Sequence, residues 1–375
     1  MNIKKSLIWF AVIFLLQGCS ETTNQETRIT SKENTQSTSS AFAAIAIPDQ
    51  YGAKISQDIL DQGGNAVDAA IAAGFSLAVT FIDAGNIGGG GFMTIKMGNE
   101  IAFLDYREKA PLAAHKDMYL DQNGNVIENS TLIGGQAVGV PGTVAGFWSA
   151  HQRFGKLPWK DLIEPAISLA EEGFLPAKIL VDDIYNSLSW FGDKTNFPAY
   201  FSSIKVDEKF KQPELAQTLR RIAKFGADDF YRGETADLIV KQMASSNGLI
   251  TKIDLEKYEA KWREPLRAKW REYEIISSPP PSSGGFAVIQ LLKMKDYLAH
   301  LFKGVGHNTP QYIHLVAEME KRVFADRAEY LGDPDFFDTN ITTLISDNYI
   351  ASRALEVNPD SISSLEGVSP GIESP

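Results

Sequence analysis

The chain has 375 residues, of which 44% are hydrophobic and 22% are charged, and its formal net charge is −11. A chain of this length and composition can bury a substantial core, in one large domain or in two moderate ones. The acidic balance, with no run of Lys and Arg after the first few residues, argues against a protein that binds nucleic acid.

The N-terminus has the pattern of a bacterial export signal. Lys4 and Lys5 precede an apolar stretch at residues 7–16, which is too short to remain as a membrane-spanning helix. The sequence LQGC that follows ends at Cys19, the only cysteine of the chain, and resembles the box at which bacterial lipoproteins are cleaved and lipidated. We therefore predict that residues 1–18 are a lipoprotein-type signal peptide and that Cys19 carries the lipid; a buried thiol is the alternative.

The segment after the cysteine is too polar to fold. Residues 19–40 contain a single aliphatic side chain among Ser, Thr, Asn, Gln and charges, so they are predicted to be a lipid-anchored flexible tether. This arrangement predicts an exported protein in the bacterial cell envelope that faces the periplasm, and Ser20 favours the outer membrane over the inner. The ordered body is expected to begin at Ala41, with the apolar run at residues 41–47 as a buried strand.

Two helices are predicted next. Ile55 and Ile59 lie on one face of the first, and two glycines after it end the helix. Asn65 then offers an N-cap, with Asp68 three residues later as in a weak capping box, to a helix over residues 66–80. The many Ala and Gly residues of that helix predict close packing against a sheet.

Four consecutive glycines at residues 88–91 precede a β-like segment. A phosphate-binding loop would open a helix instead, and the dinucleotide fingerprint also requires a helix after its glycines. The pattern thus argues against a nucleotide site and indicates close contact between two backbones. Strands are predicted at residues 92–97 and from residue 100 to about residue 108, joined by a turn at residues 98–99.

The second of these strands ends in Asp105-Tyr106-Arg107-Glu108. Strand alternation puts Asp105 and Arg107 on one face, and a guanidinium at the end of a buried strand must be paired. The residues alone leave two interpretations open. Arg107 forms a structural ion pair with Asp105 or Glu108, or its planar fork grips a substrate carboxylate.

The rest of the chain is predicted to be mostly helical from residue 142 to residue 265, with a β-like stretch at residues 270–278. The sequence PPPSSGG that follows forms either an anion-binding nest or a packed irregular turn. A helix that begins after Thr309 as its cap is predicted to run to Leu331. Residues 355–375 are short of apolar side chains and are predicted to be a linker.

The five histidines of the chain do not predict a metal site. His300, His307 and His314 recur at a spacing of seven residues, but glycines and a proline between them break any single helix that could align them. A Ser–His–Asp triad cannot be recognised from residue order, because such triads are defined by geometry.

Eight segments occur in an order that is typical of one protein family. They are GGNAVDAAIAAGFSLAVT, AGNIGGGGF, LDYREKAP, GVPGTVAGF, DDFYRG, GLITKIDL, PPPSSGG and ADRAEYLGDPDF. From residue 41 onwards the chain therefore resembles the large subunit of bacterial γ-glutamyltranspeptidases, also called glutathione hydrolases. The resemblance implies an α+β protein with an Ntn-hydrolase αββα sandwich, which a large and a small subunit cut from one precursor build together. Residues 41–354 would be the large-subunit domain.

The resemblance also implies a γ-glutamyl hydrolase or transferase that acts on glutathione and other γ-glutamyl compounds. In this family a Thr exposed by autoproteolysis at the start of the small subunit is the nucleophile, and its own amino group is the base. The acyl-enzyme passes its acyl group to water, an amino acid or a peptide, and N–H groups of the small subunit stabilise the oxyanion. Arg107 matches the family's arginine that holds the substrate α-carboxylate. The resemblance implies no metal and no other cofactor.

On this basis, residues 355–375 would lead to the autoprocessing site. This chain would hold no catalytic residue of its own and would be inactive alone. Two alternatives remain. The first is a related acylase, such as a cephalosporin or glutaryl acylase, whose substrate need not present an α-carboxylate. The second is a non-catalytic surface lipoprotein of the same fold.

Overall fold

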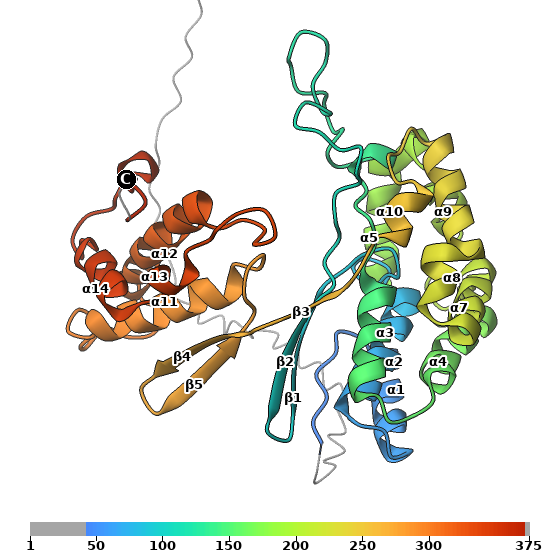
Figure 1. Ribbon diagram of the computed structural model, residues 1–375, viewed down its shortest axis with the longest axis horizontal. Helices are drawn as coiled ribbons and strands as arrows, with labels where there is room; N and C mark the ends of the chain where they lie inside the picture. Colours follow the sequence, from blue (N-terminus) through green and yellow to red (C-terminus); the bar gives the residue numbers. More distant parts are fainter. Residues whose placement is uncertain (1–42, 372–375) are drawn as a thin grey trace, which may run out of the picture. The chain divides into compact units, whose positions relative to one another are not determined.

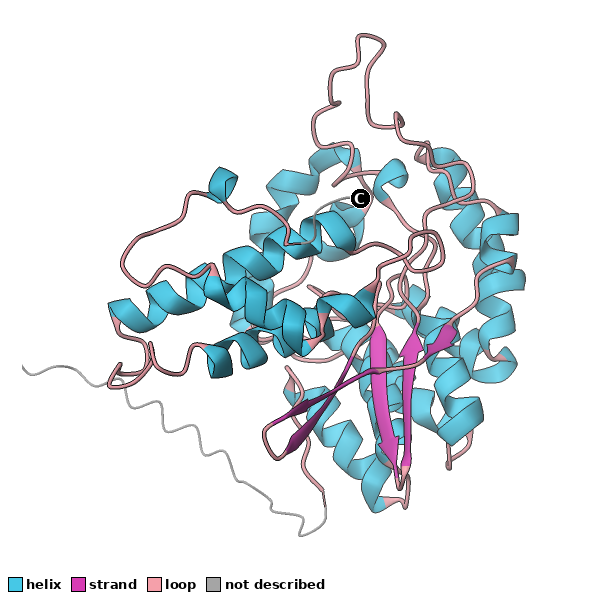
Figure 2. Cartoon of the chain, turned by 60° about the vertical axis from the view of Figure 1, so that its left-hand side comes forward, coloured by secondary structure: helices cyan, strands magenta, loops and turns pink. Residues whose placement is uncertain are grey.

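The computed structural model describes residues 43–371, which form many helices and two small antiparallel sheets (Figure 2). The predicted α+β class is therefore confirmed. The predicted signal peptide, the lipidation site Cys19 and the tether up to residue 40 lie outside the described residues. Within residues 43–371, no helix combines the length and the apolar character that are needed to cross a membrane.

Two helices that pack against each other begin this part of the chain. The side chain of Asp49 caps the first turn of α1 (Gln50–Asp61). In α2 (Ala66–Thr80), Asn65 and Asp68 form the predicted capping box. Most residues of α2 are buried, and the elements that it contacts most are the helices α1 and α4.

The apolar run at the start of the ordered body does not form the predicted strand. Residues 43–47 have no regular secondary structure and are exposed or half-buried. A strand needs a neighbour that satisfies its N–H and C=O groups, and no strand of the described chain pairs with this segment. The prediction of a buried strand is therefore wrong for the described residues of the run.

Three strands form the first sheet, in the order β1 (Phe92–Met97), β2 (Glu100–Asp105) and β3 (Lys261–Arg263) (Figure 1). The predicted hairpin is confirmed, because β1 and β2 pair across a two-residue turn in which Gly98 has a φ of 59°. The strand β2 ends at Asp105, earlier than predicted, and β3 joins its other edge from far along the sequence.

Between β2 and β3 the chain is mostly helical, as predicted. The elements are η1 (Gly135–Ala137), α3 (Thr143–Phe154), α4 (Trp159–Glu172), α5 (Lys178–Phe191), η2 (Gly192–Lys194), α6 (Phe197–Phe201), α7 (Pro213–Phe225), α8 (Ala227–Arg232), α9 (Glu234–Ser245) and α10 (Lys252–Glu256). Buried side chains of α2, α4 and α7, among them Phe75, Leu162 and Leu219, belong to one core with Ile95 and Leu104 of the sheet. This core fixes one face of the β1–β2 hairpin.

A second core lies in the last third of the described chain. It is built from β4 (Leu266–Trp270), β5 (Tyr273–Ser277), α11 (Gly284–Tyr297), α12 (Pro310–Tyr330), α13 (Ile341–Leu344) and α14 (Asp347–Leu355), and a short turn, η3 (Leu365–Gly367), follows. Thr309 caps α12, which ends one residue before Leu331, and Met319 and Val323 of its apolar face are buried. The β-like stretch at residues 270–278 is confirmed as β5 and the turn before it.

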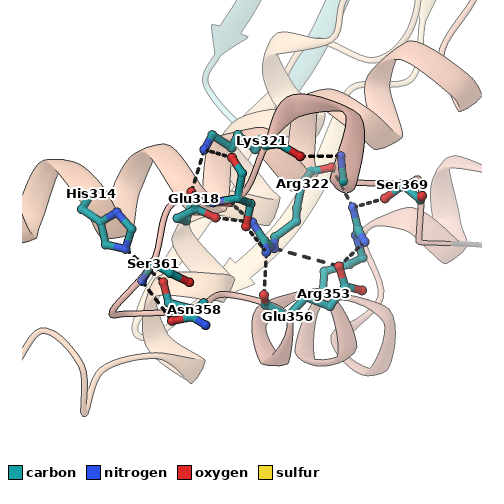
Figure 3. A network of polar contacts seen from close by, with 12 residues as sticks. His314, Glu318, Lys321, Arg322, Arg353, Glu356, Asn358, Ser361 and Ser369 are labelled. Carbon is teal, nitrogen blue, oxygen red and sulfur yellow. Dashed lines mark hydrogen bonds and ion pairs between the residues drawn. The ribbon is translucent and has the colours of Figure 1, made fainter.

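Residues 356–371, which we call the C-terminal strap, are bound to α12 and α14 by polar contacts (Figure 3). Ser363 donates its N–H to Glu318 at 3.0 Å, and Gly371 donates its N–H to Asp326 at 3.0 Å. Both acceptors are buried carboxylates of α12. The composition of the strap predicted a linker, but these main-chain contacts need no apolar side chain.

Candidate functional site

The glycine run lies against the residue that follows β2. A Cβ atom on Gly90 would lie 2.5 Å from the carbonyl oxygen of Tyr106, and one on Gly142 would lie 1.9 Å from the same oxygen. Gly142 also donates its N–H to the carbonyl of Gly89 at 2.7 Å. The predicted steric role of the glycines is therefore confirmed, because three backbone segments touch here. The strand β1 follows the run, and not the helix of a phosphate-binding loop.

Arg107 lies two residues beyond the end of β2, and its side chain is exposed. The prediction that it ends a buried strand is therefore wrong. Its main chain is held on both sides, because Asp105 Oδ1 accepts its N–H at 3.0 Å and the Tyr258 hydroxyl donates to its carbonyl at 2.8 Å. The side chain projects from a backbone that is fixed by two hydrogen bonds.

The guanidinium of Arg107 forms no ion pair with any side chain that the structure describes. Its guanidinium carbon lies over the ring of Phe92, 5.9 Å from the centroid. Asp105 pairs with Arg263 instead, at 2.8 Å between Oδ2 and Nε. The structural ion pair between Arg107 and Asp105 or Glu108 is thus not formed in the structure.

Asp105 and Asp335 are both engaged by cationic side chains other than Arg107. Asp335 accepts two hydrogen bonds from Arg263, each of 3.1 Å, and a third from Lys261 at 2.5 Å. These bonds lower the pKa of Asp335 to about 2. Burial lowers the pKa of Arg263, but its bonds to Asp335 and Asp105 outweigh burial and leave that pKa raised. Asp335 therefore stays ionised, and both Asp105 and Asp335 are engaged by other cations, which leaves the guanidinium of Arg107 available to another anion.

Tyr258 is the residue that joins Arg107 to the first core. Its ring is stacked on the ring of Tyr231, with centroids 5.5 Å apart, and the Nζ atom of Lys109 lies 5.3 Å from its centroid. Burial raises the pKa of Tyr258 far above its usual value, so the hydroxyl keeps the proton that it donates to Arg107. Burial and the charge of Lys261 lower the pKa of Lys109.

Other features that the sequence singled out have structural contacts. His151 Nε2 lies 2.8 Å from the carbonyl of Leu157, and His314 Nε2 lies 3.0 Å from that of Asn358. Within the described residues, no cluster of three or more His, Cys, Asp or Glu side chains is arranged to hold a metal ion. The PPPSSGG segment is a turn that leads into α11, with Ser283 bound to the side chain of Arg327 at 2.9 Å.

Two cavities, of about 850 and 680 Å³, lie beside the glycine run. They share Ile87, Gly88, Asn196, Tyr200 and Glu214 as lining residues. Arg107 lines neither of them, so these two cavities do not indicate which anion Arg107 binds. What the described residues provide is an exposed guanidinium on a rigid backbone, an arrangement suited to bidentate binding of a carboxylate.

Sequence analysis did not single out Tyr258 or Arg263. The first donates to Arg107 across 151 residues of sequence, and the second pairs with Asp105 across 158. Arg263 lies within the stretch that was predicted to be mostly helical, so no local signal indicated the strand β3 or its partner. These partners become visible only when β3 is paired with β2.

Known proteins resemble this chain over most of its length. The profile of a family described as Gamma-glutamyltranspeptidase matches residues 52–371. A glutathione hydrolase proenzyme of Pseudomonas aeruginosa is 55% identical over 341 residues, which are 89% of this chain and 61% of that protein. An Acylase ACY 1 proenzyme of Pseudomonas sp. SE83 is 34% identical over 79% of this chain and 54% of its own length.

A solved structure is similar in fold as well as in sequence. The γ-glutamyltranspeptidase of Pseudomonas nitroreducens complexed with L-DON superposes with a TM-score of 0.87, at 56% identity, over 88% of this chain and 99% of that chain. The present chain spans about three fifths of the length of the curated P. aeruginosa relative.

Proposed function

Because this chain belongs to the γ-glutamyltranspeptidase family, we propose that it is the large-subunit region of a γ-glutamyl hydrolase or transferase. Its helices and small sheets are the large-subunit part of the Ntn-hydrolase fold, as the resemblance implied. The donor substrates are glutathione and other γ-glutamyl compounds, and the acceptor is water, an amino acid or a peptide.

The exposed, unpaired guanidinium of Arg107 is the observation that supports this proposal most directly. A γ-glutamyl group presents a free α-carboxylate, and Arg107 offers an exposed guanidinium that pairs with none of the carboxylates that the structure describes. The fork of a guanidinium matches the two oxygens of a carboxylate, so Arg107 orients the donor by its α-carboxylate. The γ-amide of the donor then points away from Arg107 towards the nucleophile.

The nucleophile is proposed to come from a small subunit of the same precursor. The word proenzyme in the name of the P. aeruginosa relative supports a precursor that is processed. A Thr freed by autoproteolysis at the start of that subunit attacks the γ-amide carbon, and its α-amino group takes the hydroxyl proton. The C–N bond breaks, the leaving amine takes the proton, and water or an amine then displaces the Thr from the acyl group. Residues 355–375 are proposed to lead to the processing site.

The test compares two proteins, the full-length gene product and residues 41–375 alone, on a chromogenic γ-glutamyl anilide. We expect the full-length product to release the anilide and the separate region to release none. Activity of the separate region would overturn the assignment of the nucleophile to another segment. A full-length product that is folded but inactive would support the non-catalytic surface protein instead.

A related acylase is the second candidate, favoured by the 34% identity to the Acylase ACY 1 proenzyme. A glutaryl group keeps the carboxylate of a γ-glutamyl group but lacks its α-amino group. Comparing glutaryl and γ-glutamyl anilides therefore separates the two functions. We expect faster turnover of the γ-glutamyl compound, and a preference for the glutaryl compound would favour the acylase.

The membrane attachment is proposed from the sequence around Cys19, which lies outside the described residues. Acyl chains on this residue would hold the exported protein on the periplasmic side of a membrane, with the outer membrane favoured. Labelling of cells with a radioactive fatty acid tests the proposal. Incorporation into the wild type and not into Cys19→Ala is expected, and an unlabelled wild type would contradict it.

A further inference from the structure

The backbone of Arg107 is fixed by two side chains, one from its own segment and one from far along the chain. Asp105 Oδ1 accepts the N–H of Arg107 at 3.0 Å, and Tyr258, which follows α10, donates its hydroxyl to the carbonyl at 2.8 Å. Both partners are buried, with 7% of their surface exposed in each case. The main-chain N–H and C=O of Arg107 are thus both hydrogen-bonded to buried side chains.

This fixation matters because β2 has already ended. Tyr106 still exchanges two main-chain hydrogen bonds with Gly91, of 3.0 and 3.3 Å, and the next main-chain pairing of this segment is the bridge of Lys109 with Val140. Between these points, sheet hydrogen bonds do not define the backbone angles of Arg107. A small change in those angles moves the guanidinium, at the end of a long side chain, by more than the backbone itself.

Tyr258 is well placed to define the position of Arg107. Its buried ring is stacked on the ring of Tyr231, and the Nζ atom of Lys109 lies over it, so the hydroxyl has little freedom to move. Its partner Tyr231 uses its own hydroxyl elsewhere, donating to the carbonyl of Pro141 at 2.8 Å. Two stacked tyrosines of similar burial therefore have different hydrogen-bond partners.

We infer that Tyr258 is a positioning residue for Arg107: its hydroxyl holds the Arg107 carbonyl so that the guanidinium meets the carboxylate of the donor. The inference rests on the proposed role of Arg107 in γ-glutamyl binding. Tyr258 does not touch the donor itself. Its loss should therefore weaken donor binding and leave the later reaction of the acyl group with water unaffected.

The experiment uses Tyr258→Phe in the full-length protein, with Tyr231→Phe as the matched control. Both changes remove one buried hydroxyl from the same stacked pair. We expect Tyr258→Phe to raise KM for the γ-glutamyl anilide by about threefold to tenfold with kcat nearly unchanged, because one neutral hydrogen bond is lost. Tyr231→Phe should leave KM within about twofold of the wild type. Equal KM values in the two variants would overturn the inference.

A double-mutant cycle with Arg107→Ala tests whether Tyr258 acts through Arg107. Without the guanidinium there is nothing to position, so Tyr258→Phe should cause no further rise in KM. The same rise in both backgrounds would show that Tyr258 acts independently of Arg107 and would overturn the inference. If Arg107→Ala alone leaves KM unchanged, the proposed role of Arg107 fails as well. A raised KM in Arg107→Ala beside a wild-type KM in Tyr258→Phe would remove only the positioning role.

Discussion

Arg107 and Arg263 both contact Asp105, but their guanidinium groups have different surroundings. Arg263 pairs with Asp105 and Asp335, and its side chain is largely buried. Arg107 binds Asp105 only through its main-chain N–H, and its guanidinium lies 5.9 Å from the ring of Phe92. An arginine without a carboxylate partner in the described residues keeps its whole fork for a ligand.

The substitution Arg107→Lys tests the importance of that fork. Lysine keeps the charge but cannot bind both oxygens of a carboxylate in one plane. Losing a charge-assisted hydrogen bond costs about 1.5–3 kcal/mol, so KM for γ-glutamyl substrates should rise about tenfold to a hundredfold. Steady-state kinetics of the full-length protein measure this change.

Arg153→Lys is a suitable control for this substitution. Arg153 also lies over an aromatic ring, with its guanidinium carbon 4.3 Å from the centroid of Trp262, but it pairs with Glu100 on an exposed surface. We expect the KM of Arg153→Lys to remain that of the wild type. An unchanged KM in Arg107→Lys would remove its role in carboxylate binding.

At the scale of elements, the sequence predicted correctly those features whose hydrogen bonds join residues close together in the chain. The capping box of α2, the two-residue turn of the β1–β2 hairpin and the cap of α12 are all made within a few residues of one another. The strand expected at residues 41–47 is different, because a strand depends on a partner that no local pattern can supply. Its apolar residues alone did not predict its structure.

The glycine run allows a test between neighbouring positions. A Cβ on Gly90 would lie 2.5 Å from the carbonyl oxygen of Tyr106, whereas a Cβ on Gly88 would come no closer than 3.9 Å to any atom outside its immediate neighbours. Gly90→Ala should therefore lower the free energy of unfolding by about 1–3 kcal/mol, since the backbone must shift. Gly88→Ala should change it by no more than about 0.5 kcal/mol.

Chemical denaturation of both variants measures these changes. Because the displaced backbone is that of Tyr106 and Arg107, Gly90→Ala should also raise KM for γ-glutamyl substrates. Equal stability of the two variants would mean that the glycines are not needed for this close contact.

At the scale of the whole molecule, buried charges hold the C-terminal strap. Arg353, with 2% of its side chain exposed, pairs with Asp326 at 3.1 Å and donates to the carbonyl of Ser369 at 3.1 Å (Figure 3). Arg322 pairs with Glu318 at 2.9 Å on the same helix. The strap therefore depends on two buried carboxylates of α12.

Glu318 makes this region sensitive to acid. Burial raises the pKa of Glu318, but hydrogen bonds from Lys321, Ser363 and Arg322 outweigh burial and bring it to about 2, below the ordinary value of 4.5. A carboxylate whose pKa is lowered on folding stabilises the protein above its unfolded pKa, and this stabilisation is lost as the pH falls towards 2. We expect Glu318→Gln to lower the free energy of unfolding at pH 7 by up to about 3 kcal/mol.

Denaturant titrations from pH 7 to pH 2.5 measure this dependence. The fall in stability below about pH 4.5 should be smaller in Glu318→Gln than in the wild type. Glu320→Gln is the control, since Glu320 is exposed on the same helix and makes none of these contacts. Identical pH profiles for Glu318→Gln and the wild type would contradict the role of this carboxylate.

The sequence by itself determined the features that depend on near neighbours: the helix caps, the tight turn of the hairpin, the glycine contact and Arg107 as the candidate anion site. The tertiary structure alone decided that Asp105 pairs with Arg263, that Tyr258 holds the backbone of Arg107, and that the strap lies on buried charges. The physical reason is distance along the chain. Tyr258 lies 151 residues from Arg107, and Arg263 lies 158 residues from Asp105. Tertiary packing brings these pairs together, and no periodicity in the sequence specifies which distant side chains form a contact.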